Sequence, residues 1–205
     1  MRAPRVLLAS VVAFAVGTAA TLFAEDVDLK ATLAGIQTAV AEKHYGRALA
    51  DLQTVLAEVS RLRADTLKRV LPAAPEGWTA GEPEAQDAAA MAAVVGATIV
   101  RRGYERGEAR VTAELIVGGG MWFAPLQALL ANPAFLPPQL KAVTVKGRRG
   151  VLEHDAEAKH GTLQLLLSVP NALLRLEGDG VTREDLESTF VGAFDLDKVE
   201  KAAQD

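Results

Sequence analysis

The chain has 205 residues, half of them hydrophobic, and carries 22 Lys and Arg against 26 Asp and Glu. This composition is that of a globular protein, and the length allows one or two domains with a core that needs no cross-links. Because there is no Cys, disulfides, a Cys nucleophile, a thiolate metal site and lipoprotein attachment through an N-terminal Cys are excluded.

Residues 1–24 have the pattern of a secretory signal peptide. Arg2 and Arg5 form a short basic region, residues 6–23 carry no charge, and small residues near the end permit cleavage. The uncharged stretch is also at the short end of what spans a bilayer of about 30 Å, so a retained anchor is the alternative. We expect a periplasmic or secreted protein with no membrane span after cleavage. The mature chain is acidic, which argues against a nucleic-acid partner.

Residues 25–72 predict two helices, with Asp28 as the N-cap of the first and Pro72 ending the second. Apolar residues recur at helical spacing in two segments separated by a break at Lys43-His44-Tyr45-Gly46: Leu29, Leu33, Ile36 and Val40, then Leu49, Leu52, Leu56, Val59, Leu67 and Val70. The short break favours an antiparallel helical hairpin. Its apolar stripe must lie against the rest of the chain or a second copy, and binding of a protein partner is a hypothesis.

A linker is predicted over residues 73–95. Pro and Gly are frequent at its start, and the Ala-rich stretch from Glu84 to Ala93 has little side-chain volume with which to build a core. This stretch predicts either a short helix, since Ala is the best helix former, or a mobile connector, and we favour the helix.

Residues 96–205 predict a sheet domain. Short apolar segments separated by Gly, Pro or Asn indicate strands: 98–104, 109–117, 142–146, 150–154, 162–168 and 172–177. Helices are expected over 121–130, from a Thr182/Asp185 capping box to Val191, and after Asp195. Because most connections are too short for parallel crossovers, the predicted fold class is α+β, a helical hairpin followed by an antiparallel sheet of about six strands with helices packed on it.

The segment Pro75-Glu76-Gly77-Trp78, the turns at Gly147 and Gly178, and the order of strands, helix, meander and terminal helix resemble the fold of the PsbP extrinsic photosystem proteins over residues 72–200. The chain is also similar to uncharacterised secreted bacterial proteins that pair a helical hairpin with a PsbP-like α+β domain. This resemblance implies a non-catalytic domain that docks on a partner. It carries over no binding residue, because no binding motif of the family is matched.

The candidates for ligand binding are a glycine triplet and three aromatic residues: Gly118, Gly119, Gly120, Trp78, Trp122 and Phe123. The triplet either lets a backbone approach a ligand closely or forms a bend. The aromatic residues either line an apolar pocket between the sheet and the helices or anchor the core. Core anchoring is favoured, because aromatic side chains bury large areas.

A loop between two predicted strands holds the side chains that best suit a metal ion: His154, Asp155, Glu157 and His160. Imidazole and carboxylate ligands are acceptable to zinc and copper. Nothing in the sequence fixes their geometry, and a solvated hairpin tip carries the same residue types, which is the favoured interpretation. No cofactor is expected.

The sequence contains no HExxH, GxSxG, phosphate-loop or dinucleotide-binding pattern. It therefore favours an exported, non-enzymatic accessory protein of the bacterial envelope that binds a protein partner, or itself, through the helical hairpin. The alternatives are a periplasmic carrier with a small-ligand pocket near Trp122 and a metal-dependent enzyme that uses His154 and His160.

Overall fold

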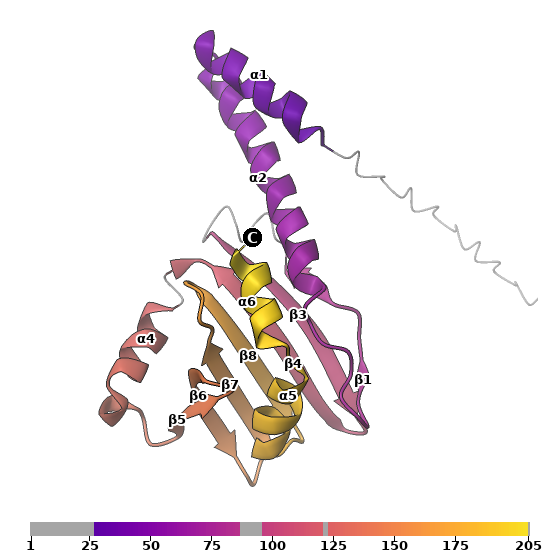
Figure 1. Cartoon of the computed structure of the whole chain (residues 1–205), viewed down its shortest axis with the longest axis vertical. Helices are drawn as coiled ribbons and strands as arrows, with labels where there is room; N and C mark the ends of the chain where they lie inside the picture. Colours follow the sequence, from indigo (N-terminus) through magenta and orange to yellow (C-terminus); the bar gives the residue numbers. More distant parts are fainter. Residues whose placement is uncertain (1–26, 87–95, 121–122, 205) are drawn as a thin grey trace, which may run out of the picture.

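The protein is α+β, with an antiparallel sheet of eight strands, in a computed structural model that describes residues 27–86, 96–120 and 123–204. Two helices, α1 (Leu29–Ala41) and α2 (Tyr45–Lys68), rise from one end of the sheet, as Figure 1 shows. We call residues 29–68 the arm and the remainder of the described chain the body.

The sheet has the strand order β1-β3-β4-β8-β7-β6-β5, with β2 paired to β3 beside β1. All pairs are antiparallel. The strands are β1 (Thr79–Ala80), β2 (Glu84–Gln86), β3 (Ala97–Arg106), β4 (Ala109–Gly118), β5 (Leu140–Val145), β6 (Arg148–Asp155), β7 (His160–Leu166) and β8 (Ala172–Asp179).

Two of these strands were not expected. β1 and β2 lie in the predicted linker, and β2 takes the first three residues of the stretch for which a helix was expected. Residues 87–95 of that stretch are outside the described part of the chain. Both strands are too short to show a periodic pattern, and they exist because β3 offers its edge to them.

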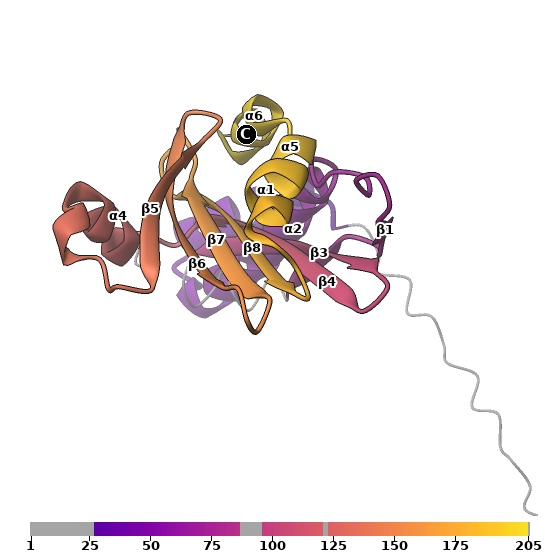
Figure 2. The same ribbon diagram turned by 90° about the horizontal axis from the view of Figure 1, so that it is seen from below.

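Elements from both ends of the chain cover one face of the sheet. The last turns of α2 pack there, with η3 (a π-helix, Asp185–Phe190), α5 (Val191–Ala193) and α6 (Leu196–Gln204). Figure 2 shows α5 and α6 together on one side of the curved sheet. The buried layer between them includes Leu67, Tyr104, Leu174, Phe190 and Val199.

The other face is apolar at one end only. There α4 (Ala124–Ala131) places Leu126 and Leu130 over Ile116 and Leu173, and the 3₁₀ helix η2 (Pro133–Phe135) follows. The rest of this face is polar, so the sheet presents one dry face and one largely wet face, as antiparallel sheets commonly do.

The C-terminal helices begin where their capping residues predict. The Thr182 hydroxyl accepts from the Asp185 backbone N–H at 3.1 Å, and the Asp185 carboxylate accepts from the Thr182 N–H at 2.9 Å, which completes the expected capping box. Asp195 likewise accepts from the Lys198 N–H at 3.1 Å. Partial burial opposes ionisation of Asp185, but the Thr182 bonds and Arg106 hold its pKa below its usual value.

The segment that follows α2 is fixed to β3 through one carbonyl. The Pro72 carbonyl accepts hydrogen bonds from the Tyr104 hydroxyl at 2.9 Å and from Arg102 Nη1 at 2.8 Å. Burial raises the pKa of Tyr104 to about 12, so the phenol keeps the proton that it donates. The chain that leaves the arm is therefore held to β3 at Pro72.

An ion pair clamps α6 to the sheet. Glu200 accepts from Arg148 at 2.9 Å (Nε) and 2.8 Å (Nη2), and also from the Ser168 backbone N–H at 2.8 Å. The Arg148 guanidinium holds the pKa of the Glu200 carboxyl below its usual range. Burial partly opposes this lowering of the pKa, and the hydrogen bond from Ser168 adds to it. Asp197 also pairs with Arg148, at 2.7 Å, but it is exposed to solvent.

Replacing Glu200 by Gln should lower the free energy of unfolding at neutral pH by about 2–3 kcal/mol, because a charge-assisted pair is lost. The pKa of Glu200 is lower in the folded state than in the unfolded state. The contribution of the ion pair to the free energy of unfolding is therefore complete above the unfolded-state pKa and is lost as the pH falls through the folded-state pKa. Urea denaturation from pH 7 to about pH 3 should thus show the difference from wild type shrinking below about pH 4.5. Asp197→Asn is the matched control and should change stability little. A Glu200→Gln difference that stayed constant down to pH 3 would contradict this assignment.

Candidate functional site

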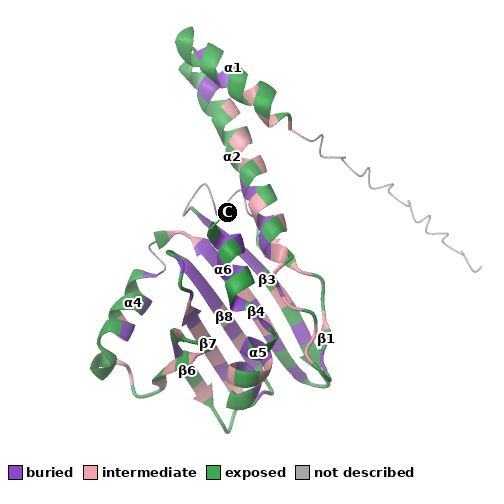
Figure 3. Ribbon diagram, in the orientation of Figure 1, coloured by how far each residue is buried: buried purple, intermediate pink, exposed green. Residues whose placement is uncertain are grey.

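Exposed apolar side chains gather on the arm. Eight large hydrophobic residues of α1 and α2 are 45–62% exposed: Leu33, Val40, Tyr45, Leu49, Leu52, Leu56, Val59 and Leu62. In the part of the chain that the structure describes, Phe135 is the other exposed large hydrophobic residue. Figure 3 shows that the arm is mostly exposed above the point where α2 meets the sheet.

Five of these residues form a straight line along α2. Tyr45, Leu49, Leu52, Leu56 and Val59 follow one another at steps of four, three, four and three. This is the 3.5-residue spacing of the apolar seam in coiled coils, where the line of side chains faces a second helix. We call these five residues the α2 seam.

No charged residue flanks the α2 seam on either side. The helical positions on one side of it are Gly46, Gln53 and Ser60, and those on the other are Ala48, Val55 and Leu62. The charges of this part of α2 lie on the remaining face: Arg47, Asp51, Glu58 and Arg61. The apolar band is therefore wider than the seam, as on a helix that belongs to a bundle.

The exposed apolar residues of α1 lie on the same side of the arm as the α2 seam. Ile36 and Ala39 are buried against Ala48 and Val55 of α2, and at 100° per residue Leu33 and Val40 are turned roughly 80° away from that contact. The α2 seam is turned by a similar angle from the α1 contact. Because the two helices are antiparallel, rotations of the same sense about each helix's own axis are opposite in sense when both helices are viewed along one direction. The exposed apolar residues of α1 and the α2 seam therefore face the same side of the arm.

The body covers only the lower end of this side. Ala64 and Leu67 are buried against the body, and Ser60, one turn earlier, is also buried. Arg63, the next residue on the line of the α2 seam, donates from Nη2 to the Ala203 carbonyl of α6 at 3.3 Å. From Val59 back to Tyr45 no part of the described chain covers the seam.

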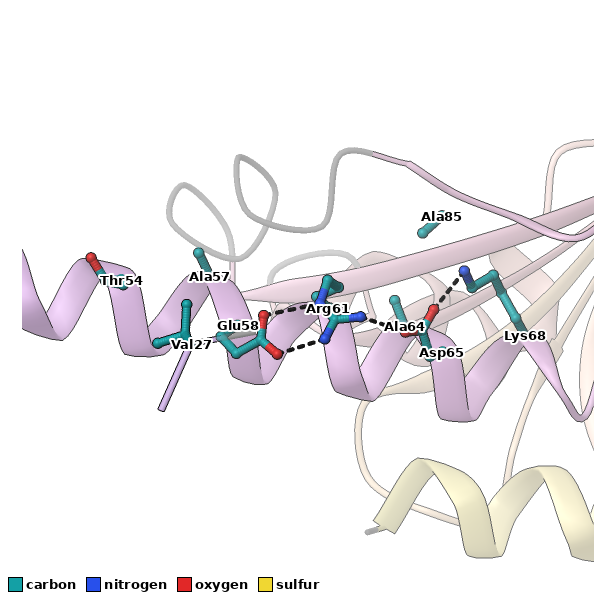
Figure 4. A pocket seen from close by; sticks show the side chains of 9 residues that line it. All are labelled: Val27, Thr54, Ala57, Glu58, Arg61, Ala64, Asp65, Lys68 and Ala85. Carbon is teal, nitrogen blue, oxygen red and sulfur yellow. Dashed lines mark hydrogen bonds and ion pairs between the residues drawn. The ribbon is translucent and has the colours of Figure 1, made fainter. Parts of the chain in front are cut away.

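A cavity of about 530 Å³ lies on the opposite side of α2, between α2 and β2. Its lining, drawn in Figure 4, consists of Val27, Thr54, Ala57, Glu58, Arg61, Ala64, Asp65, Lys68 and Ala85. A ladder of ion pairs runs along it, from Glu58 to Arg61 at 2.6 Å, from Arg61 to Asp65 at 3.2 Å and from Lys68 to Asp65 at 2.6 Å. Since the charges pair with one another, Val27 and the alanines are the lining groups that could contact an apolar ligand.

The predicted aromatic candidates are core residues where the structure describes them. Trp78 is 6% exposed, with its ring 4.8 Å from that of Phe190 and under the Arg106 guanidinium at 4.4 Å. Phe123 is 1% exposed and packs in the cluster below α4. Trp122 lies outside the described residues. The two described aromatics anchor opposite faces of the sheet and do not share a pocket.

The glycine triplet forms a bend at the end of β4. Gly118 and Gly119 have φ values of 90° and 64°, a region that favours glycine. The Gly118 N–H donates to the Asn171 carbonyl at 2.8 Å, and a Cβ at Gly118 would collide with the Gly96 carbonyl oxygen. Gly118 thus serves the close approach of two backbone segments.

The predicted metal ligands are spread over the β6–β7 turn. His154 lies 3.1 Å from the Val181 carbonyl on one face of the sheet, while His160 pairs with Asp179 at 2.7 Å on the other. Asp155 accepts from the backbone N–H groups of Glu157 and Ala158, and these amides, Ala158 first, hold its pKa below the usual value. In the described residues no three His, Asp or Glu are grouped to hold a metal ion.

Two residues of the apolar surface were missed in the sequence. Tyr45 was placed in the break between the helices, and Leu62 was not assigned to the stripe. Stepping back four residues from Leu49 would have included Tyr45. Leu62 is exposed because α1 does not extend far enough along α2 to cover it. Only the packing of the two helices shows this.

Comparisons with known proteins give no family model, curated protein or solved structure that matches the chain at a significant level. The PsbP-like resemblance therefore stays a prediction. No helix in residues 27–86, 96–120 and 123–204 has the length and apolarity needed to cross a bilayer.

The separation of His154 from His160 gives a direct test of the metal hypothesis. Titration with zinc in a calorimeter should show no stoichiometric site that needs both imidazoles, because they lie on opposite faces of the sheet. One zinc ion per chain, lost in His154→Ala and equally in His160→Ala, would contradict this expectation.

Proposed function

We propose that the protein is an exported accessory protein of the bacterial envelope that works by binding protein through its arm, not by catalysis. The observation that carries this proposal is the α2 seam, which is apolar, regularly spaced and uncovered by the described chain. Export is supported by the sequence pattern of residues 1–24, which lie outside the described residues.

The size of the apolar surface supports binding over chance exposure. Taking full areas of roughly 150–200 Å² per residue, the eight exposed residues of the arm leave on the order of 700 Å² open to solvent. The largest apolar patch on a typical monomer is about 300–600 Å² and is often functional. A helix that presents such a line of side chains is suited to a helical partner, whose own side chains fit between them.

Photo-crosslinking in the producing cell tests this function. A photoreactive amino acid at Leu52, on the α2 seam, should give discrete crosslinked protein bands, whereas the same amino acid at Ala50, exposed on the charged side of α2, should give few. Equal labelling from both positions would show that the seam is not a binding surface.

A small-ligand carrier is the second candidate, and the cavity between α2 and β2 is the observation that favours it. Its volume of about 530 Å³ is within the range of ligand sites, although neither Trp78 nor Phe123 is among the described residues that line it. Native mass spectrometry of the purified protein should show added mass that is lost on denaturation and is absent in an Ala57→Trp variant. A bare mass in the wild-type spectrum would remove this candidate.

A further inference from the structure

We infer that the arm binds a second copy of this chain, with two α2 helices packed antiparallel along their seams and related by a two-fold axis. This inference rests on the proposed function, because it names the occupant of the same surface. The result is a four-helix bundle made from two arms.

The order of residues along α2 is self-complementary in the antiparallel direction. If the two-fold axis passes at the level of Thr54, Leu52 of one copy lies opposite Leu56 of the other, and Leu49 lies opposite Val59. In this register each pair of facing residues joins the first apolar position of the seven-residue repeat on one helix to the second apolar position on the other. Antiparallel helix pairs have this arrangement. Each of Leu49, Leu52, Leu56 and Val59 therefore faces another apolar residue.

The charges at the ends of the line also fit this register. Arg63 continues the seam at the body end and lies opposite Tyr45 at the tip of the second copy. Its guanidinium can then sit on the face of an aromatic ring that is 59% exposed in the single chain. A parallel pairing would instead bring the two Arg63 side chains together, which like charges oppose.

The exposed area matches what such a dimer needs. The open surface of the eight apolar residues is on the order of 700 Å² per copy, and a standard interface takes about 800 Å² from each partner. Leu33 and Val40 add to it because they lie on the same side, so α1 also meets the second arm. Uncharged neighbours on both sides of the α2 seam leave no unpaired charge in the buried centre.

The shape of the protein permits this arrangement. The arm extends away from the body (Figure 1), and the paired line from Tyr45 to Arg63 is about 27 Å long at 1.5 Å per residue. Antiparallel pairing places the two bodies at opposite ends of the bundle. The contact of Arg63 with Ala203 of α6 marks the point where the body stops the second arm.

The first test is the mass of the protein in solution, measured by light scattering after size-exclusion chromatography on protein purified from its full-length gene. We expect twice the monomer mass. Leu52→Glu should reduce it to the monomer mass, and Ala50→Glu, which adds the same charge on the opposite side of the same helix, should leave the dimer intact. Circular dichroism checks that both variants stay folded. A monomeric wild type at about 100 µM would overturn the inference.

The second test determines the register of the two α2 helices. Because the chain has no Cys of its own, only the introduced Cys residues can form disulfides. Leu49→Cys and Val59→Cys chains, mixed and oxidised, should form disulfides between the two different variants much faster than within either variant alone. Faster Leu49→Cys self-crosslinking would indicate parallel pairing and overturn the proposed geometry.

The two proposals fail in distinguishable ways. If the wild type is a monomer while the photoreactive group at Leu52 still crosslinks to a different protein, the second-copy inference is wrong and docking through the arm stands. If the Leu52 group crosslinks only to another copy of this chain, the inference is supported.

Discussion

The structure depends on the need to cover one apolar face of an antiparallel sheet from both ends of the chain. The C-terminal helices cover most of that face, and the last turns of α2 complete it. Because α6 occupies the space beside Arg63, α2 can use only its final turns for the core. The remaining turns of α2 are carried out into solvent, with their apolar residues still aligned.

Polar contacts hold the chain in place where the arm meets the body. The Pro72 carbonyl receives two hydrogen bonds from β3, and the Arg148–Glu200 pair holds α6 in the place where Arg63 reaches it. A surface held in this way loses little conformational freedom when it binds, which favours association for a given buried area. In the proposed function, the body contributes by holding the arm in place.

Several of the residues with the most suggestive chemistry make contacts within the fold. Trp78 and Phe123 anchor opposite faces of the sheet, Gly118 and Gly119 turn the chain, and His154 and His160 point to opposite sides of a hairpin. The apolar surface on the arm has no such chemistry. Its significance comes from exposure, which a sequence does not report directly.

The sequence by itself determined the helices from Leu29 and the long strands, because their periodicity and their caps at Asp28, Thr182 and Asp195 are local properties. It did not contain β1 and β2, which form only against the edge of β3. It also indicated an apolar stripe on the two helices, but not which part the body covers. Tertiary structure decided that point, because burial depends on where residues distant in sequence, such as Ala203, come to lie.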